Sequence, residues 1–174
     1  MVSIQRIAVV GAGMMGAEIA LSFAFYGAEI LLKDVTFDLA AAGKKRLEGV
    51  IRKWEEKGKI EKGHDQEALA RITPQDNYTG FDQVGLVIEA VVEDKETKSR
   101  VFKELEETCS KHCIFASNTS SISISELAAT TSRSDGFIGM HFFSPASVMK
   151  LVEVIPGLDT SEETLQKITD IVRE

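Results

Sequence analysis

The sequence predicts a doubly wound α/β fold, in which helices cover both faces of a mostly parallel sheet. Short aliphatic runs recur along the 174 residues, and longer segments with helical spacing separate them. Aliphatic runs without polar alternation are typical of strands buried on both faces, and strand–helix alternation is typical of parallel sheets. A glycine-rich turn between the first run and the first helical segment supports the same fold class. The length is enough for one ordinary core, so residues 1–174 are expected to form one domain.

The first half of the chain contains a strand–helix–strand unit followed by a long helical excursion. Aliphatic runs predict the strands, an apolar stretch ending before a glycine predicts the helix, and an apolar stripe at helical spacing predicts the excursion. The segments are Arg6–Val10 and Glu29–Lys33 (strands), Ile19–Phe25 (helix, with Gly27 as its stop) and Thr36–Lys62 (long helix, with Leu47, Val50, Ile51 and Trp54 on its stripe). The next residues, Thr73–Gly80, are predicted to form turns because proline, asparagine and glycine gather there.

The second half repeats the alternation of strands and helices. Aliphatic runs again predict strands, and charged amphipathic stretches between them predict helices. The expected strands are Leu86–Ile88, Ile114–Ala116, Phe137–His141 and Leu151–Ile155, and the expected helices are Lys95–Ser110, Ile124–Ala129 and Ser161–Glu174. Thr160 or Ser161 is the expected cap of the last helix, and Glu163 would complete a capping box with Thr160.

The charge balance excludes some classes of partner. The chain has 27 acidic and 20 basic residues and a formal net charge of −7. This field repels polyanions, so we expect neither nucleic acids nor anionic membranes as partners, although a local site can still bind a small anion. The apolar stretch Ile7–Leu32 is interrupted by Glu18 and Glu29 and has no signal-peptide pattern, so no membrane segment is predicted.

The two cysteines, Cys109 and Cys113, flank His112 in a spacing that suggests metal binding. A four-coordinate site usually needs a second pair of ligands, and none is visible in the sequence. We therefore expect reduced thiols near a helix end and no metal. Reduced thiols fit a cytoplasmic location.

The segment Gly11-Ala12-Gly13-Met14-Met15-Gly16 matches G-x-G-x-x-G, and its context makes this weak pattern informative. It follows a predicted strand, opens a helix and precedes Asp34 at the end of the second strand. In this Rossmann-type arrangement Gly11 permits the tight turn, Gly13 lets the backbone approach a pyrophosphate, and Gly16 allows close helix–strand packing. Asp34 would accept hydrogen bonds from the adenosine ribose and repel a 2′-phosphate, which favours NAD over NADP. The alternative is a glycine turn without a ligand and a surface aspartate.

His141 is the candidate general base among three histidines. His64 and His112 lie in polar surroundings and are expected to be solvated. His141 ends a predicted strand, at the edge where parallel sheets bind ligands, and Glu153 lies inside an apolar strand where a buried carboxylate needs a partner. If the two strands are adjacent, Glu153 can accept the Nδ1–H of His141 and raise the basicity of Nε2. The alternative places Glu153 in solvent and His141 in the core.

Two further polar regions are open to more than one interpretation. The loop Ser117–Ser121 can bind a ligand or simply cap a helix, and the same holds for Glu89 and Glu93. The segment Lys44–Lys62 has a local charge of +4, which usually marks a solvated helix face. Three of its basic residues are spaced by seven and would share one side of the helix, where a phosphate-bearing substrate tail can lie: Lys45, Arg52 and Lys59.

Taken together, these motifs resemble the NAD-binding domain of the 3-hydroxyacyl-CoA dehydrogenase family, which includes 3-hydroxybutyryl-CoA dehydrogenases. The resemblance rests on GAGMMGAEIA, LLKD, VIEAVVED, FASNTSSISISELA and above all GMHFFSPASVMKLVEVI. It implies that His141 is the catalytic base, Glu153 its orienting partner and Ser120 the hydroxyl that contacts the substrate oxygen. It also implies that Glu93, Lys98 and Asn118 line the cofactor cleft, with Met14 and Met15 in the glycine loop, and that the basic helix meets coenzyme A.

The resemblance further implies parts that this sequence lacks: the last strands of the domain, a catalytic asparagine, and a helical C-terminal domain through which family members form homodimers. We therefore expect a cofactor domain truncated near its carboxyl end, with little or no turnover alone. The expected activity of the complete enzyme is NAD-dependent interconversion of L-3-hydroxyacyl-CoA and 3-ketoacyl-CoA in fatty acid or butanoate metabolism. The alternatives are a non-catalytic NAD-binding module and a related hydroxyacid dehydrogenase, although the latter typically use a catalytic lysine.

Overall fold

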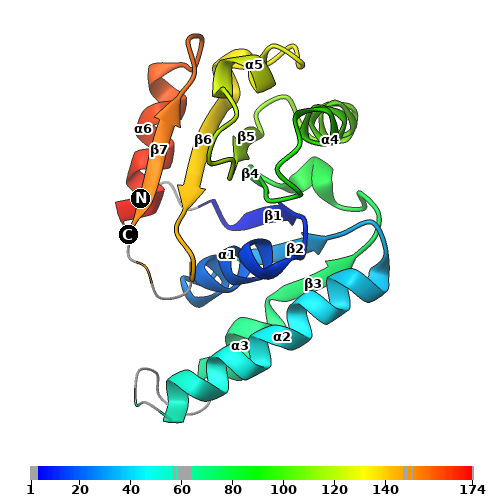
Figure 1. The fold of residues 1–174 in the computed structure, drawn as a ribbon, viewed down its shortest axis with the longest axis vertical. Helices are drawn as coiled ribbons and strands as arrows, with labels where there is room; N and C mark the ends of the chain where they lie inside the picture. Colours follow the sequence, from blue (N-terminus) through cyan, green and yellow to red (C-terminus); the bar gives the residue numbers. More distant parts are fainter. Residues whose placement is uncertain (1–3, 57, 59–63, 147–148, 150, 174) are drawn as a thin grey trace.

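Seven strands among the described residues form one sheet in the order β3-β2-β1-β4-β5-β6-β7 (Figure 1). They are β1 (Arg6–Val10), β2 (Glu29–Lys33), β3 (Ile72–Gln75), β4 (Leu86–Glu89), β5 (Ile114–Ser117), β6 (Phe137–Phe142) and β7 (Val152–Pro156). All neighbouring strands are parallel except β6 and β7, which are antiparallel. The computed structural model describes residues 4–56, 58, 64–146, 149 and 151–173. The predicted doubly wound, mostly parallel sheet is confirmed.

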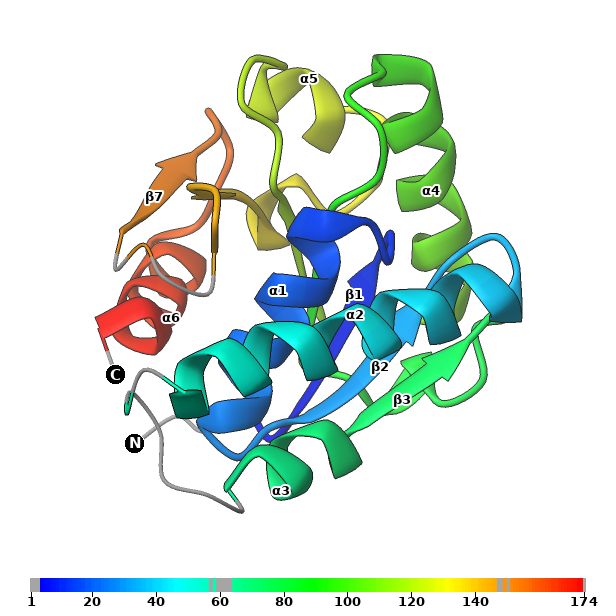
Figure 2. The same cartoon turned by 60° about the horizontal axis from the view of Figure 1, so that its bottom comes forward.

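Helices cover both faces of this sheet. One face carries α1 (Met14–Phe25), α2 (Phe37–Glu56), α3 (His64–Ala70) and α6 (Glu162–Arg173), and the other carries α4 (Lys95–Thr108) and α5 (Ile124–Ala128) with the short 3₁₀ helices η1 (Phe81–Gln83) and η2 (Ser134–Gly136). Figure 2 shows α1 and α2 lying across β1 and β2. The central strands β4 and β5 are buried at every residue, as expected for strands covered on both sides.

An aromatic cluster holds α4 against the sheet. Phe102 of α4, Phe115 of β5 and Phe137 of β6 are all fully buried. The ring centroids of Phe102 and Phe137 lie 4.5 Å apart in an edge-to-face arrangement. Such a contact adds to the hydrophobic effect of burying two large side chains. It fixes α4 relative to the carboxyl ends of the central strands, where the polar loops begin.

The helical excursion after β2 is shorter than the sequence predicts. The prediction of a single helix over 36–62 is wrong, because α2 ends at Glu56 and a separate helix, α3, begins at His64. Residues 57 and 59–63 lie outside the described part of the chain. Gly58 has a φ of 63°, a backbone conformation that continues no right-handed helix. Glycines are the usual residues at such helix ends, so the break fits the local chemistry.

The predicted turns at Thr73–Gly80 are wrong at their beginning, where Ile72–Gln75 forms β3. Within the described part of the chain this strand pairs only with β2, so it is an edge of the sheet. Proline is tolerated on edge strands because its missing N–H can face away from the neighbouring strand, so Pro74 does not prevent pairing. The first helix also begins earlier than Ile19, at Met14, directly after the glycine turn.

The last two strands position the candidate base. The antiparallel register of β6 and β7 aligns His141 with Glu153 as direct neighbours. The loop after β7 leads to α6, whose first turn is capped by the hydroxyl of Ser161, which accepts a hydrogen bond from the N–H of Thr164. The hydroxyl of Thr160 instead donates to the carbonyl of Phe137, so Ser161 is the cap.

Candidate functional site

The glycine turn between β1 and α1 has the geometry that its sequence predicts. Gly11 has a φ of 100°, and a Cβ added there would lie 2.5 Å from the carbonyl oxygen of Ala90. A Cβ added to Gly16 would lie 1.8 Å from the carbonyl oxygen of Gly11, so only glycine permits this close packing of helix and turn. At Gly13 no atom lies within 4 Å of an added Cβ. The turn thus leaves open space over Gly13 while being closely packed on either side.

The amino terminus of α1 opens onto this space. Gly13 is the N-cap and supplies no side-chain hydrogen bond, and the first turn has no acidic residue. The first N–H groups of an α-helix have no partner within the helix, and together with the helix dipole they favour an anion. Open space above Gly13 and uncapped donors at Met14 and Met15 fit the pyrophosphate of a dinucleotide.

Asp34 follows β2 and lies beside the glycine turn. Its Oδ2 accepts a hydrogen bond from the N–H of Ala12 at 2.7 Å, and its Oδ1 accepts one from the N–H of Val35 at 2.7 Å. These two bonds hold the carboxylate over the turn, and each oxygen keeps further acceptor capacity. The carboxylate therefore suits a ligand with vicinal hydroxyl groups, as the adenosine ribose of NAD has.

His141 and Glu153 form the predicted hydrogen bond. The Nδ1 of His141 lies 2.8 Å from Oε2 of Glu153, and the His141 side chain is 20% exposed. Because a carboxylate only accepts hydrogen bonds, Nδ1 carries the hydrogen of the neutral ring and Nε2 keeps its lone pair. The imidazole is thus oriented as a proton acceptor at Nε2. Glu153 is half-exposed on the edge strand β7, so the expectation of a buried carboxylate is wrong, although the predicted contact forms.

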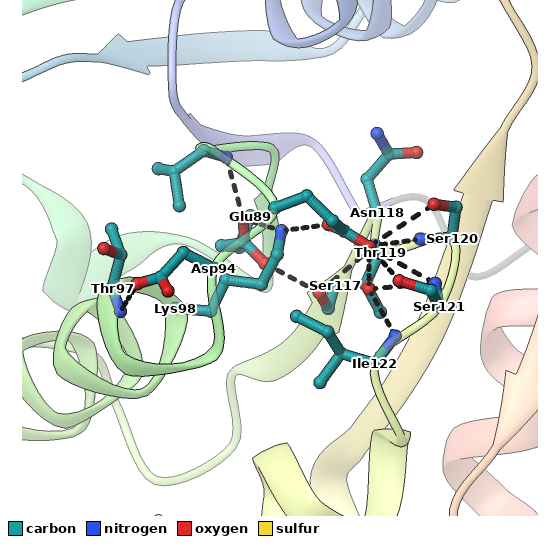
Figure 3. A network of polar contacts seen from close by, with 12 residues as sticks. Glu89, Asp94, Thr97, Lys98, Ser117, Asn118, Thr119, Ser120, Ser121 and Ile122 are labelled. Carbon is teal, nitrogen blue, oxygen red and sulfur yellow. Dashed lines mark hydrogen bonds and ion pairs between the residues drawn. The ribbon is translucent and has the colours of Figure 1, made fainter.

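The loop that follows β5, drawn in Figure 3, is held in place by Glu93 of the segment after β4. Oε1 of Glu93 accepts hydrogen bonds from the hydroxyl of Thr119 at 2.5 Å and from the N–H groups of Ser120 and Ser121 at 2.9 and 3.2 Å. The hydroxyl of Ser120 also donates to this oxygen, at 3.3 Å. Asn118 fixes the other side of the loop, because its Oδ1 accepts the N–H of Phe142.

These contacts hold Glu93 in its ionised form. Its partial burial raises the pKa, but the hydrogen bonds from Thr119 and Ser120 and the nearby Lys98 ammonium outweigh burial and lower the pKa to about 2. The carboxylate therefore keeps its negative charge across the physiological range. The loop and its Ser120 hydroxyl are anchored to a permanent anion.

Lys98 is buried, in contrast to what a charged helix pattern suggests. Its side chain is 1% exposed, and its Nζ lies 2.7 Å from Oε1 of Glu89 and 3.2 Å from Oε2 of Glu93. Asp94 caps the start of α4 by accepting the N–H of Thr97, which places Lys98 one turn into the helix. The buried Glu89 was left ambiguous by the sequence, and no sequence signal identifies it as the partner of Lys98.

The basic residues of α2 are only partly described. Lys45 and Arg52 are exposed on α2, and neither has an ion-pair partner among the described residues. Lys59 lies outside the described residues. Arg46 on the same helix donates to the carbonyl oxygen of Ala12, which brings a further positive charge to the glycine turn.

Other features lie away from this edge of the sheet. A cavity of about 540 Å³ opens at the amino ends of β1 and β2, but its charges are already paired, with Arg6 against Glu29 and Arg71 against Glu67. Cys109 and Cys113 are free and buried. No three metal-binding side chains gather within the described part of the chain. None of the helices described there is long and apolar enough to cross a membrane.

Comparisons with known proteins agree with this geometry. The chain is 44% identical over 161 residues to a probable 3-hydroxybutyryl-CoA dehydrogenase of Bacillus subtilis, which covers 92% of the chain and 56% of that protein. It is 43% identical over 162 residues to the fatty acid oxidation complex subunit alpha of Acinetobacter baumannii, covering 93% of the chain and 23% of that protein. The chain thus spans about half, or less, of the length of these curated relatives.

Solved structures share the fold closely. The crystal structure of (S)-3-hydroxybutyryl-CoA dehydrogenase from Ralstonia eutropha superimposes with a TM-score of 0.95 at 38% identity, covering 98% of this chain and 60% of that one. The 3-hydroxybutyryl-CoA dehydrogenase of Escherichia coli K12 gives a TM-score of 0.94 at 34% identity, covering 99% and 36%. The sequence pattern of the family described as "3-hydroxyacyl-CoA dehydrogenase, NAD binding domain" matches residues 6–174. Because this match spans nearly the whole chain, the chain belongs to the 3-hydroxyacyl-CoA dehydrogenase family, and residues 6–174 correspond to the NAD-binding domain of that family.

Proposed function

We propose that this domain serves an oxidoreductase that interconverts an L-3-hydroxyacyl-CoA and a 3-ketoacyl-CoA. The observation that carries the proposal is the His141–Glu153 hydrogen bond of 2.8 Å at the carboxyl edge of a sheet that also carries the glycine turn and Asp34. A proton acceptor near a dinucleotide site is what alcohol oxidation requires. The names of the Bacillus and Ralstonia relatives, both 3-hydroxybutyryl-CoA dehydrogenases, support the same reaction for this chain.

In this reaction the Nε2 of His141 removes the proton of the substrate hydroxyl, and in reverse it returns that proton to the ketone oxygen. Bound NAD would supply the acceptor for the hydride that leaves the carbon carrying this hydroxyl, so the products would be the ketone, NADH and one proton. Glu153 stabilises the imidazolium that forms, because its carboxylate lies against Nδ1–H. The hydroxyl of Ser120 would hold the reacting oxygen after exchanging its bond to Glu93 for one to substrate.

The cofactor would be held by residues of four loops at this edge. The turn residues Gly11, Gly13, Met14, Met15 and Gly16 would receive its pyrophosphate, Asp34 its adenosine ribose, and Glu93 and Asn118 its nicotinamide half, while the buried Lys98 would act only through Glu93. Hydrogen-bonding capacity toward a neutral ribose and the negative charge of Asp34 favour NAD over a cofactor with a 2′-phosphate.

The coenzyme A tail would lie along the basic face of α2. Lys45 and Arg52 are exposed and seven residues apart, so they share one side of the helix. Lys59, the third residue of the predicted set, comes after the end of α2 at Glu56 and lies outside the described residues. Coenzyme A carries phosphate groups, and Lys and Arg recognise phosphate by charge and hydrogen bonding.

The test is acetoacetyl-CoA-dependent oxidation of NADH by the longest product that the gene encodes. His141→Gln is expected to lower turnover by roughly two to four powers of ten, on the usual scale of general acid–base catalysis, while NADH affinity measured by calorimetry is unchanged. His112→Gln is the matched control, because this exposed histidine precedes β5 at the opposite edge of the sheet. Retained turnover in His141→Gln would refute the assignment, and NADH binding without any oxidation in the wild type would favour a non-catalytic module.

Two wider expectations belong to the same proposal. The relatives are longer than this chain, and the family resemblance implies a further helical domain. Both support the expectation that the complete protein has a helical domain that closes the substrate cleft and forms a homodimer. The free thiols of Cys109 and Cys113 support a reducing, cytoplasmic compartment. Size-exclusion chromatography of the full gene product and localisation of a tagged version test these points.

A further inference from the structure

A fully buried ion pair lies at the end of β4, and the proposed chemistry does not use it. Glu89 is 0% exposed and the Lys98 side chain 1% exposed, and their charged atoms lie 2.7 Å apart. Glu89 also accepts a hydrogen bond from the hydroxyl of Ser117 at 2.6 Å and one from the N–H of Val91 at 2.7 Å. The pair therefore joins β4, α4 and β5 beside the loop Ser117–Ser121 (Figure 3).

The pair continues to the loop through Glu93. The same Nζ of Lys98 reaches Oε2 of Glu93 at 3.2 Å, while Oε1 of Glu93 receives the N–H groups of Ser120 and Ser121. One carboxylate oxygen is thus anchored to the buried ammonium and the other to the loop. Glu93 itself is 39% exposed, so its position depends on these contacts more than on packing around it.

Burial makes this arrangement sensitive to charge. A buried ammonium is unfavourable without a carboxylate partner, and removal of one member of a buried pair leaves the other charge uncompensated. Without the charge of Glu89, the only carboxylate left beside Lys98 among the described residues is Glu93. Movement of Glu93 toward the buried ammonium would take its Oε1 away from the loop.

We propose that Glu89 is a positioning residue of the loop that carries Ser120. Glu89 fixes the ammonium of Lys98, Lys98 fixes the carboxylate of Glu93, and Glu93 fixes the backbone at Ser120 and Ser121. The conformation at Ser120 and Ser121 is thus set, through three successive contacts, by a fully buried charge. The consequence for turnover rests on the proposed function, because it depends on Ser120 holding the substrate oxygen, whereas the consequence for the loop does not.

The test compares Glu89→Gln, Lys98→Met and the double variant with the wild-type chain. Two properties are measured: the thermal unfolding midpoint and the hydrogen exchange of the amides of Ser120 and Ser121. A matched control is Glu126→Gln, which removes one charge from the exposed Lys95–Glu126 pair, also 2.7 Å long, between α4 and α5. An exposed pair contributes little to stability, so this control should change neither property.

Both single variants should be less stable and should exchange these two amides about tenfold faster or more, the change expected when a hydrogen bond of ordinary strength is lost. The double variant has no unpaired buried charge, so its stability should recover toward that of the wild type. Its loop amides should nevertheless remain fast, because Glu93 still lacks its anchor. If the Glu89–Lys98 pair only stabilised the fold, slow exchange of these amides would return in the double variant together with stability.

Slow exchange of Ser120 and Ser121 in the double variant, or unchanged exchange in a folded Glu89→Gln, would overturn the proposal. If either single variant fails to fold, the double variant alone decides between the two outcomes. Turnover with acetoacetyl-CoA is then measured on the same set, and a loss in the double variant extends the effect to Ser120. If the wild-type protein lacks turnover while the variants show the expected exchange pattern, the proposed function is refuted and the positioning role of Glu89 stands.

Discussion

Substitutions in the glycine turn separate its structural role from cofactor binding. Gly13→Ala and Gly16→Ala each add one methyl group, but the two groups meet different surroundings. At Gly13 nothing lies within 4 Å of the new carbon and φ is −62°, so the chain accommodates it. At Gly16 the new carbon would lie 1.8 Å from the carbonyl oxygen of Gly11, whereas such contacts normally exceed about 3.3 Å.

The magnitudes follow from these distances. In Gly16→Ala the backbone has to move by more than about 1 Å, and overpacking of this kind costs up to about 3 kcal/mol, which lowers the unfolding midpoint of a domain this size by roughly 6–12 °C. In Gly13→Ala the loss of an unhindered N-cap costs at most about 1 kcal/mol. The methyl group occupies the space proposed for the pyrophosphate, and weakening of charge-assisted hydrogen bonds by about 1.5–3 kcal/mol raises the NADH dissociation constant roughly 10- to 150-fold.

Differential scanning fluorimetry gives the stabilities, and isothermal titration calorimetry with NADH gives the affinities. The expected pattern is a stable Gly13→Ala that binds NADH poorly, beside a destabilised Gly16→Ala. A folded Gly13→Ala with wild-type affinity for NADH would show that the pyrophosphate does not lie over Gly13.

Three further predictions concern the cofactor preference, the loop anchor and the core. Asp34→Asn should weaken NADH binding about tenfold and reduce the preference for NADH over NADPH, because the substitution removes the charge that repels a 2′-phosphate. Calorimetry with both cofactors measures the two dissociation constants, and an unchanged ratio between them would contradict this prediction. The pKa of Glu93 lies at about 2 in the folded chain, below its ordinary 4.5, so its contribution to stability is present above pH 4.5 and is lost as the pH falls toward 2. The difference in urea midpoint between wild type and Glu93→Gln should therefore shrink as the pH falls from 4.5 toward 2. A constant difference would show that the charge of Glu93 does not stabilise the folded chain. Phe102→Ala should lower the free energy of unfolding by about 3–5 kcal/mol, since its fully buried ring packs against Phe137 at 4.5 Å; a loss below about 1 kcal/mol in urea denaturation contradicts the packing.

Local patterns account for the parts of the fold and the site that were predicted from the sequence. The aliphatic strands β1, β2, β4 and β5 need burial on both faces whatever their partners are, and the glycine turn needs its glycines for its own backbone geometry. The contact between His141 and Glu153 was predictable because few basic groups were eligible as partners of Glu153, although the burial that was expected to require this contact is absent, since Glu153 is half-exposed. Their catalytic roles stay predictions.

The errors arose where pairing outweighs local preference. Pro74 and its polar neighbours suggest turns, yet they form an edge strand that needs hydrogen bonds on one side only. The stripe between Leu47 and Trp54 favours one long helix over 36–62, but α2 ends at Glu56. Lys98 looks like any lysine on a charged helix, and only its neighbours from β4 and the following segment make its burial possible.

The sequence by itself determined the fold class, the glycine turn with Asp34, and the candidate base, because each depends on spacing within a short segment or on a group that has few possible partners. The tertiary structure decided the antiparallel register that brings Glu153 to His141, and it decided the connection from Glu89 through Lys98 and Glu93 to the Ser120 loop. Those contacts join residues of different elements, and the energy of a buried charge depends on which groups surround it in space. Neighbours along the chain do not specify that environment, so it was settled only when the sheet and α4 were assembled.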